Sequence, residues 1–191
     1  MQLLKERILK EGRVLPGNII KIDGFLNHKV DMSLMRAIAR EFAALFDLEG
    51  ITAVVTVEAS GIALGAICAE EYGVPLVFAK KSKSDNIEGG LYQSDIFSYT
   101  YNKKVTLLVS KQWLGVDDKV LIVDDFLANG EALRGVVEIV DQAGAEILGI
   151  GIAVEKGFQP GGQRMRDAGH NLKSLAIIDK ADENGIVFRG E

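Results

Sequence analysis

KVLIVDDFLANGEA, residues 119–132, is the stretch of sequence that decides the fold. It begins with a run of apolar residues, continues into two adjacent carboxylates and a short loop containing Asn129 and Gly130, and ends in a helical pattern. A continuous apolar run of this length is typical of a parallel strand buried on both faces. In open α/β sheets, ligands bind beyond the carboxyl ends of such strands. The stretch therefore predicts a central strand and, directly after it, a binding site.

The loop after this strand has the features of an anion site. Backbone N–H groups at a helix N-terminus, beside a glycine that permits close approach, bind groups of phosphate size. Asp124 and Asp125 would repel that phosphate if they touched it, so we expect them to accept hydrogen bonds from sugar hydroxyls nearby. The alternative is a capped turn whose two aspartates face solvent.

A second junction of the same kind is VEASG, residues 57–61. Its small residues would let backbone amides approach another anion, for instance a diphosphate, where a helix begins at Gly61. An ordinary strand-to-helix turn is the alternative. Glu58 does not fit a diphosphate site by itself, because a carboxylate there needs a cation between the two negative groups.

Three lysines, Lys80, Lys81 and Lys83, follow the next apolar run. Such a run is often only a solvated face, but beside two anion loops these lysines are candidates for binding a diphosphate. The polar segment that begins here, about residues 82–104, is predicted to be a mobile flap with one or two antiparallel strands, able to close over the site.

The rest of the chain alternates apolar strands with amphipathic helices, which predicts a single α/β domain with a central, mostly parallel sheet flanked by helices. Helices are expected at residues 2–11, 31–48 with Asp31 as its cap and Gly50 as its stop, 61–73, 130–143 and 163–168. Strands are expected within 18–28 before a turn at Asp23-Gly24, and at 51–59, 75–81, 105–110, 119–125, 146–156, 172–178 and 186–189.

Composition narrows the class of protein. The chain has 191 residues, 48% hydrophobic and 26% charged, with a single cysteine, Cys68, which we expect to be buried. One cysteine is typical of a reducing, cytoplasmic setting, and no apolar run reaches the roughly 18 residues of a membrane span. The net charge of −5 argues against a nucleic-acid-binding surface but not against one small polyanion. Trp113 is expected to pack in the core or at an interface.

Several motifs together resemble the type I purine and pyrimidine phosphoribosyltransferases, and the resemblance covers nearly the whole chain. They are KIDGFLNHKVD (21–31), VEASGIALG (57–65), PLVFAKKSKS (75–84), DDFLANGEAL (124–133) and GIGIAVEKGFQPG (149–161). The resemblance implies the type I phosphoribosyltransferase fold, with a small hood from about residues 1–30 and 156–191 and the flap at 82–104. It implies transfer of 5-phosphoribose from phosphoribosyl diphosphate to a purine, and within the family the motifs favour xanthine, giving xanthosine 5′-monophosphate.

The resemblance also implies roles for particular residues. Asp124 and Asp125 would be catalytic; phosphoribosyl diphosphate would contact Ala128, Asn129, Gly130, Glu131, Ala132, Ser60, Gly61 and Lys81; xanthine would contact Ile20, Asn27, Phe126 and Lys156. Mg²⁺ is expected to arrive with the diphosphate and ribose oxygens, without a dedicated protein metal site. A homodimer is expected, and neither nucleic acid nor membrane is expected as a partner.

The sequence departs from the family pattern in the phosphate loop. Asn129 and Ala132 stand where many members carry threonine hydroxyls, so part of that hydrogen bonding must come from amides. Ala128 stands where hypoxanthine–guanine relatives hold an aspartate that acts as general base. We infer that the base arrives partly ionised and that Lys156 favours the anion. A transferase for another purine and a regulator that senses phosphoribosyl diphosphate remain alternatives.

Overall fold

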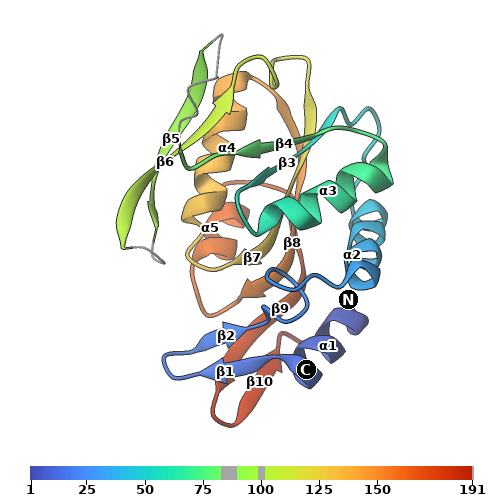
Figure 1. Cartoon of the computed structure of the whole chain (residues 1–191), viewed down its shortest axis with the longest axis vertical. Coiled ribbons are helices and arrows are strands. Elements are labelled where there is room, and N and C mark those ends of the chain that lie inside the picture. The colour runs from blue at the N-terminus through green and yellow to red at the C-terminus, as the bar shows by residue number, and fades with distance from the viewer. Residues whose placement is uncertain (83–89, 99–101, 191) are drawn as a thin grey trace.

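Helices and strands are interspersed along the part of the chain that the structure describes, residues 1–82, 90–98 and 102–190 of a computed structural model (Figure 1). The helices are α1 (Gln2–Glu11), α2 (Met32–Leu45), α3 (Gly61–Tyr72), α4 (Glu131–Ala143) and α5 (Gly161–Asp167). The strands are β1 (Arg13–Leu15), β2 (Ile19–Lys21), β3 (Ala53–Val57), β4 (Leu76–Ala79), β5 (Leu91–Ser98), β6 (Lys103–Ser110), β7 (Lys119–Leu127), β8 (Glu146–Lys156), β9 (Leu172–Asp182) and β10 (Gly185–Phe188).

Strand β7 lies inside the main sheet, as its apolar sequence predicts. Among the described residues this sheet has six strands, in the order β10-β9-β8-β7-β3-β4. Every neighbouring pair is parallel except β10 with β9, which is antiparallel. The predicted mostly parallel sheet is confirmed, and because its strands run the same way, β3 and β7 deliver their following loops to the same edge.

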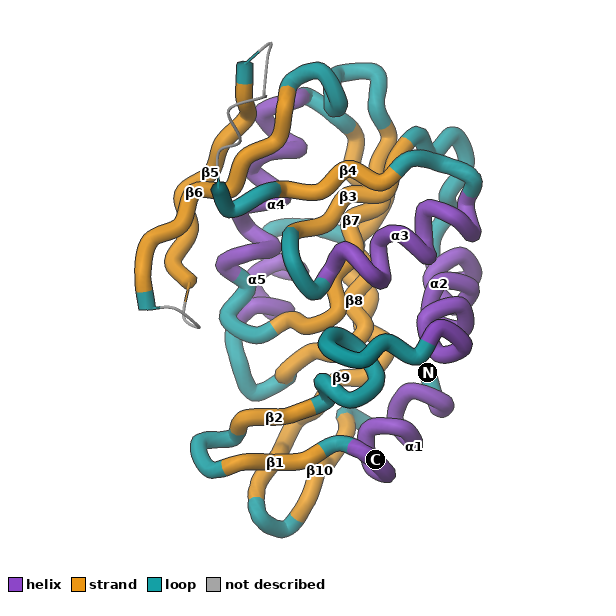
Figure 2. The backbone as a smooth tube through the Cα atoms, viewed as in Figure 1, coloured by secondary structure: helices purple, strands orange, loops and turns teal. Residues whose placement is uncertain are grey.

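Helices cover both faces of this sheet (Figure 2). Alternate residues of a strand point to opposite faces, and so Val54 of β3 packs with the core under α1, α2 and α3, whereas Val55 packs with the core under α4. Each core is an extensive cluster of buried aliphatic side chains. Cys68 of α3 is fully buried in the first of them, which confirms its predicted structural role.

Helix α2 begins as predicted but ends earlier. The Asp31 carboxylate accepts hydrogen bonds from the backbone N–H groups of Ser33 and Leu34, a typical N-cap. The helix ends at Leu45, ahead of the expected stop at Gly50, because Phe46 leaves the helix and packs over Gly149. A Cβ at Gly149 would lie 2.3 Å from the Phe46 ring, so only glycine leaves room for it.

The two ends of the chain come together at one end of the molecule (Figure 1). The expected strand within 18–28 is short, and its partner β1, which the sequence analysis did not predict, joins it in an antiparallel hairpin. Helix α1 and this hairpin contact β9, and side chains of α1 share a core with Phe188 of β10. The two segments assigned to the hood therefore lie side by side.

The described part of the predicted flap consists of β5 and the start of β6. These strands form an antiparallel hairpin that packs against α4. The Gln142 side chain accepts a hydrogen bond from the N–H of Gln93 and donates one to its carbonyl, at 3.2 and 2.8 Å. A Cβ at Gly135 of α4 would lie 2.6 Å from Ile96, so helix and hairpin are in close contact. Residues 83–89 and 99–101, with Lys83, lie outside the described residues, and closure of the flap stays a prediction.

Trp113 lies on the surface. Its side chain is 67% exposed, so the expectation of a core position was wrong and the alternative of an interface remains. It occupies the turn after β6, where the chain reverses before β7, and nothing in the sequence pattern distinguishes such a turn residue from a buried one. Within the described residues, no helix is both long enough and apolar enough to cross a membrane.

Candidate active site

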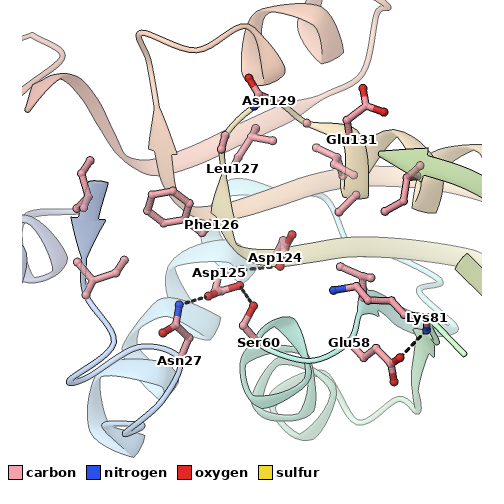
Figure 3. A pocket seen from close by; sticks show the side chains of 18 of the residues that line it. Asn27, Glu58, Ser60, Lys81, Asp124, Asp125, Phe126, Leu127, Asn129 and Glu131 are labelled. Carbon is pink, nitrogen blue, oxygen red and sulfur yellow. Dashed lines mark hydrogen bonds between the residues drawn. The ribbon is translucent and has the colours of Figure 1, made fainter. Parts of the chain in front are cut away.

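A cavity of about 480 Å³ opens at the carboxyl ends of β3 and β7, where the sequence predicts the chemistry (Figure 3). It is bordered by the loop after β2, by β5 of the hairpin and by the start of α4. Its lining is formed by Ile20, Lys21, Ile22, Asp23, Asn27, Val57, Glu58, Ser60, Lys81, Ile96, Phe97, Asp124, Asp125, Phe126, Leu127, Ala128, Asn129, Gly130, Glu131, Ala132 and Leu133.

The two aspartates of β7 lie at the bottom of this cavity and are buried. Asp124 is 9% exposed and Asp125 is 1% exposed, so the alternative of a solvent-facing pair was wrong. The Asp125 carboxylate accepts hydrogen bonds from Asn27 Nδ2 and Ser60 Oγ, each at 2.8 Å (Figure 3). The buried charge is thus held by donors from two distant segments, as buried polar groups require.

Asp124 has a less favourable environment than its neighbour. Its Oδ1 accepts a hydrogen bond from the backbone N–H of Asp125 at 3.0 Å. Burial, and then repulsion from the Asp125 carboxylate, raise the pKa of Asp124 well above its ordinary value of 3.8, and the positive charge of Lys81 opposes this only in part. A cation or hydroxyl donors brought in by a ligand would stabilise the ionised form.

Of the two site residues predicted at the second junction, one lines the cavity and the other lies behind it. Ser60 lines the cavity, but Gly61 does not. A Cβ at Gly61 would lie 2.2 Å from Thr56 Oγ1, which donates a 2.7 Å hydrogen bond to the carbonyl of Val123. Gly61 therefore lets α3 begin close to β3 and β7, and it supports the site through packing.

Glu58 lines the cavity, and one of its two carboxylate oxygens is bonded to the neighbouring loop. Its Oε1 accepts a hydrogen bond from the backbone N–H of Lys81, which joins the loops after β3 and β4 (Figure 3). Lys81 lines the cavity, as predicted, whereas Lys80 pairs its backbone with Leu108 and does not line it. Only one lysine of the run among the described residues can therefore bind an anion here.

The predicted phosphate cradle, residues 128–132, lines the cavity throughout its length. Gly130 caps α4 with φ +85°, a left-handed conformation that glycine adopts without strain. A Cβ at this position would also lie 2.9 Å from Gly161 Cα of α5. The loop and the N-terminus of α4, where the helix dipole is positive, form an arrangement suited to a phosphate.

Three of the four residues predicted to hold the base line the cavity: Ile20, Asn27 and Phe126. Lys156 does not. Its Nζ donates a 3.1 Å hydrogen bond to the carbonyl of Asn18 and lies 5.6 Å from the centre of the ring of Phe126, which itself lines the cavity. Burial lowers the pKa of Lys156, because a desolvated ammonium loses hydration.

The cavity also contains residues that the sequence analysis missed. Lys21 and Asp23 form an ion pair at 3.2 Å on the side of β2, and Ile96 and Phe97 come from β5. Lys21 and Asp23 belong to one of the motifs that resemble the family, but their positions in that motif do not indicate that they line the cavity. The second pair reaches the cavity only because α4 carries the hairpin there, a long-range placement without a local signal.

Oxygen donors suited to Mg²⁺ are present in the cavity. Within residues 1–82, 90–98 and 102–190, no group of three His, Cys, Asp or Glu lies close enough to hold a metal ion. Mg²⁺ is commonly bound by one or two carboxylates together with substrate phosphates and water. The buried, unfavourably charged Asp124 beside Asp125 fits that use, since a nearby cation would offset its desolvation.

Comparison with known proteins agrees with this geometry. Residues 27–187 match the phosphoribosyl transferase domain. A xanthine phosphoribosyltransferase of Lachnoclostridium phytofermentans is 50% identical over 193 residues, covering all of both chains, and one of Ligilactobacillus salivarius is 50% identical over 191 residues, with the same coverage. The adenine phosphoribosyltransferase of Giardia lamblia in complex with 9-deazaadenine has 26% identity and a TM-score of 0.76, covering 91% of this chain and 96% of that one.

An acidic pair at the end of a buried parallel strand, followed by an anion cradle, defines a transferase of the type I phosphoribosyltransferase fold. The chain belongs to the phosphoribosyl transferase family.

The raised pKa of Asp124 predicts that the stability of the protein depends on pH. A carboxyl whose folded pKa is raised binds protons more tightly in the folded chain, so wild-type stability falls as pH rises from 3.8 through the raised value. Asp124→Asn removes that loss. We expect a higher melting temperature at pH 7, by about 2–4 °C for each kcal/mol recovered, and no difference below about pH 3.5.

The exposed Asp141→Asn on α4 is the control; it lies in the last turn of the helix, where removal of a negative charge is worth about 0.3–1 kcal/mol, so its rise in melting temperature should be smaller than that of Asp124→Asn. Thermal unfolding of the three proteins across pH 3.5 to 8 measures the effect. An Asp124→Asn protein no more stable than wild type at pH 7 would contradict the assignment of a destabilising buried charge.

Proposed function

We propose that the protein transfers 5-phosphoribose from phosphoribosyl diphosphate to xanthine, giving xanthosine 5′-monophosphate and diphosphate. The observation that carries the proposal is the meeting of the acidic pair and the anion cradle in one cavity. The relatives with 43–50% identity that are named xanthine phosphoribosyltransferases support the choice of base. A transferase for another purine is the second candidate, since the solved structures of this fold include adenine phosphoribosyltransferases.

In this mechanism the cradle binds the 5′-phosphate through the backbone N–H groups of residues 128–132 at the start of α4. Asp124 and Asp125 accept hydrogen bonds from the ribose hydroxyls. As the bond from the anomeric carbon to the diphosphate breaks, positive charge develops on the ribose ring, and the two carboxylates stabilise it. Lys81 stabilises the negative charge that collects on the leaving diphosphate.

Mg²⁺ bound with the substrate would supply further charge neutralisation on the diphosphate, and Asp124 and Asp125 are the carboxylates that would help to hold it. The purine lies between Phe126 and the loop after β2, where Ile20 and Asn27 line the cavity. Ala128 offers no side chain that removes a proton from the base. Xanthine, more acidic than guanine or hypoxanthine, enters partly ionised, and the Lys156 ammonium favours that anion.

The central test is the variant with both Asp124→Asn and Asp125→Asn. Without the two negative charges, stabilisation of the developing cation is lost, and we expect turnover with xanthine to fall by at least about 10²-fold. Asp141→Asn is the matched control and should keep wild-type turnover. Circular dichroism confirms folding, and near-normal turnover in a folded double variant would contradict the role of the acidic pair.

A second test concerns the base. Turnover of xanthine, guanine, hypoxanthine and adenine under one condition ranks the substrates, and a preference for adenine would favour the second candidate. In Lys156→Ala, kcat/KM for xanthine should fall about 10-fold or more beyond any fall for guanine, because a hydrogen bond to a charged group is worth about 1.5–3 kcal/mol. Equal losses for both bases would contradict anion selection by Lys156.

We further propose that two copies associate and that the protein acts in the cytoplasm. The exposed Trp113 supports the first proposal, and the lone, buried Cys68 supports the second. Sedimentation equilibrium should give the mass of a dimer for wild type, and Trp113→Ser should shift the mass toward that of the monomer. A wild-type monomer at micromolar concentration would contradict the dimer.

A further inference from the structure

An ion pair between a buried carboxylate, Glu155, and a partly exposed guanidinium, Arg166, lies behind the phosphate cradle, outside the cavity. Glu155, near the end of β8, is 2% exposed, and its two carboxylate oxygens accept hydrogen bonds from Arg166 of α5 at 2.8 and 2.7 Å. The Ser174 hydroxyl of β9 donates to the same carboxylate. Burial acts to raise the pKa of Glu155, but Arg166 and Ser174 outweigh it and lower the pKa, so the carboxylate is ionised at neutral pH.

The helix that carries Arg166 also touches the cradle. Its first residue, Gly161, donates its N–H to the carbonyl of Ala128 at 3.1 Å. A Cβ at Gly161 would lie 2.3 Å from that oxygen and 2.7 Å from the backbone nitrogen of Gly130. The start of α5 is therefore in backbone-to-backbone contact with the loop that presents the N–H groups, and neither can shift without the other.

The same turn of α5 lies directly on Glu155. A Cβ at Gly162 would be 2.0 Å from Glu155 Oε1, so the carboxylate is packed against the helix backbone. In the sheet, Glu155 pairs with Leu127, the residue before the cradle. The ion pair thus ties α5 to β8 at the level where β7 turns into the cradle.

We propose that Glu155, through its two-pronged bond to Arg166, is a positioning residue that sets the conformation of the phosphate cradle by holding α5 against it. The proposal rests on the proposed function for the identity of the bound group, a sugar phosphate. Its effect falls on binding of the phosphate, because Glu155 contacts α5 behind the cradle and does not line the cavity.

An ion pair suits this task better than apolar packing. Bidentate pairing of a guanidinium with a carboxylate fixes both distance and orientation. Loss of the Glu155 charge removes this bidentate contact, so the Arg166 guanidinium, whose side chain is 28% exposed, no longer holds α5 in one orientation. A displacement of about 1 Å at a substrate-binding group is enough to change affinity or rate up to 10²-fold.

The test uses Glu155→Gln and measures ribose 5-phosphate binding by calorimetry, beside steady-state kinetics. We expect the Kd for ribose 5-phosphate and the KM for phosphoribosyl diphosphate to rise about 10- to 100-fold. The KM for xanthine and kcat at saturation should stay within about threefold. Gly161→Ala, which displaces the cradle directly, should show the same pattern, and the double variant should be no worse than the poorer single one.

The control for a general loss of stability is Ile38→Val, in the core on the opposite face of the sheet. Its melting temperature is compared with that of Glu155→Gln, and its Kd for ribose 5-phosphate should equal that of wild type. If Glu155→Gln does not fold, Arg166→Lys, which keeps the charge and loses the two-pronged geometry, replaces it. A Kd unchanged from wild type in the folded variant would overturn the proposal.

The two proposals fail in different ways. A wild-type protein that turns over xanthine while Glu155→Gln binds ribose 5-phosphate normally overturns the positioning role alone. A wild-type protein that binds ribose 5-phosphate and transfers to no purine, with binding weakened in Glu155→Gln, overturns the proposed function and supports the positioning role.

Discussion

The buried carboxylate of Asp125 is the interaction on which the site depends. It accepts one hydrogen bond from Asn27, in the loop after β2, and one from Ser60, at the start of α3. These donors lie 98 and 65 residues away in sequence, so one charge joins three separate segments at the edge of the sheet. Because a buried charge without donors is very unfavourable, the carboxylate requires each segment to be in place before the cavity takes its shape.

The Asp125 charge also disfavours ionisation of the neighbouring Asp124 carboxyl. Asp124 lies next to it, buried, with only one backbone hydrogen bond among the described contacts and a raised pKa. Groups with strongly shifted pKa values of this kind cluster at functional sites. The net charge of −5 is compatible with a polyanionic substrate, because Lys81 and the start of α4 provide positive charge locally at this edge.

The local sequence predicts a strand or the start of a helix where neighbouring residues alone determine it. The apolar run of β7 and the cap at Asp31 are short-range features, and the structure confirms them. The end of α2 could not be predicted, because Phe46 leaves the helix to fill space over Gly149, about 100 residues away in sequence.

The residues of the site also fall into those that the local sequence predicts and those that depend on long-range packing. Most of the residues predicted from the two strand-to-helix junctions line the cavity, because parallel strands bring their carboxyl ends to one edge. Gly61 proved to support packing, and Glu58 bonds to the Lys81 backbone, since those outcomes depend on Thr56 and on the next strand. The β5 wall and the bond between Gly161 and the cradle arise from tertiary packing alone.

Helix α4 carries two parts of the cavity at once. Its N-terminus bears the cradle, and one turn along it Gly135 admits the β5 hairpin that supplies Ile96 and Phe97. The distance between the anion-binding loop and that wall is consequently set by the fixed rise of a helix and not by the length of any loop. In this direction the span of the cavity is therefore a property of helix α4 itself.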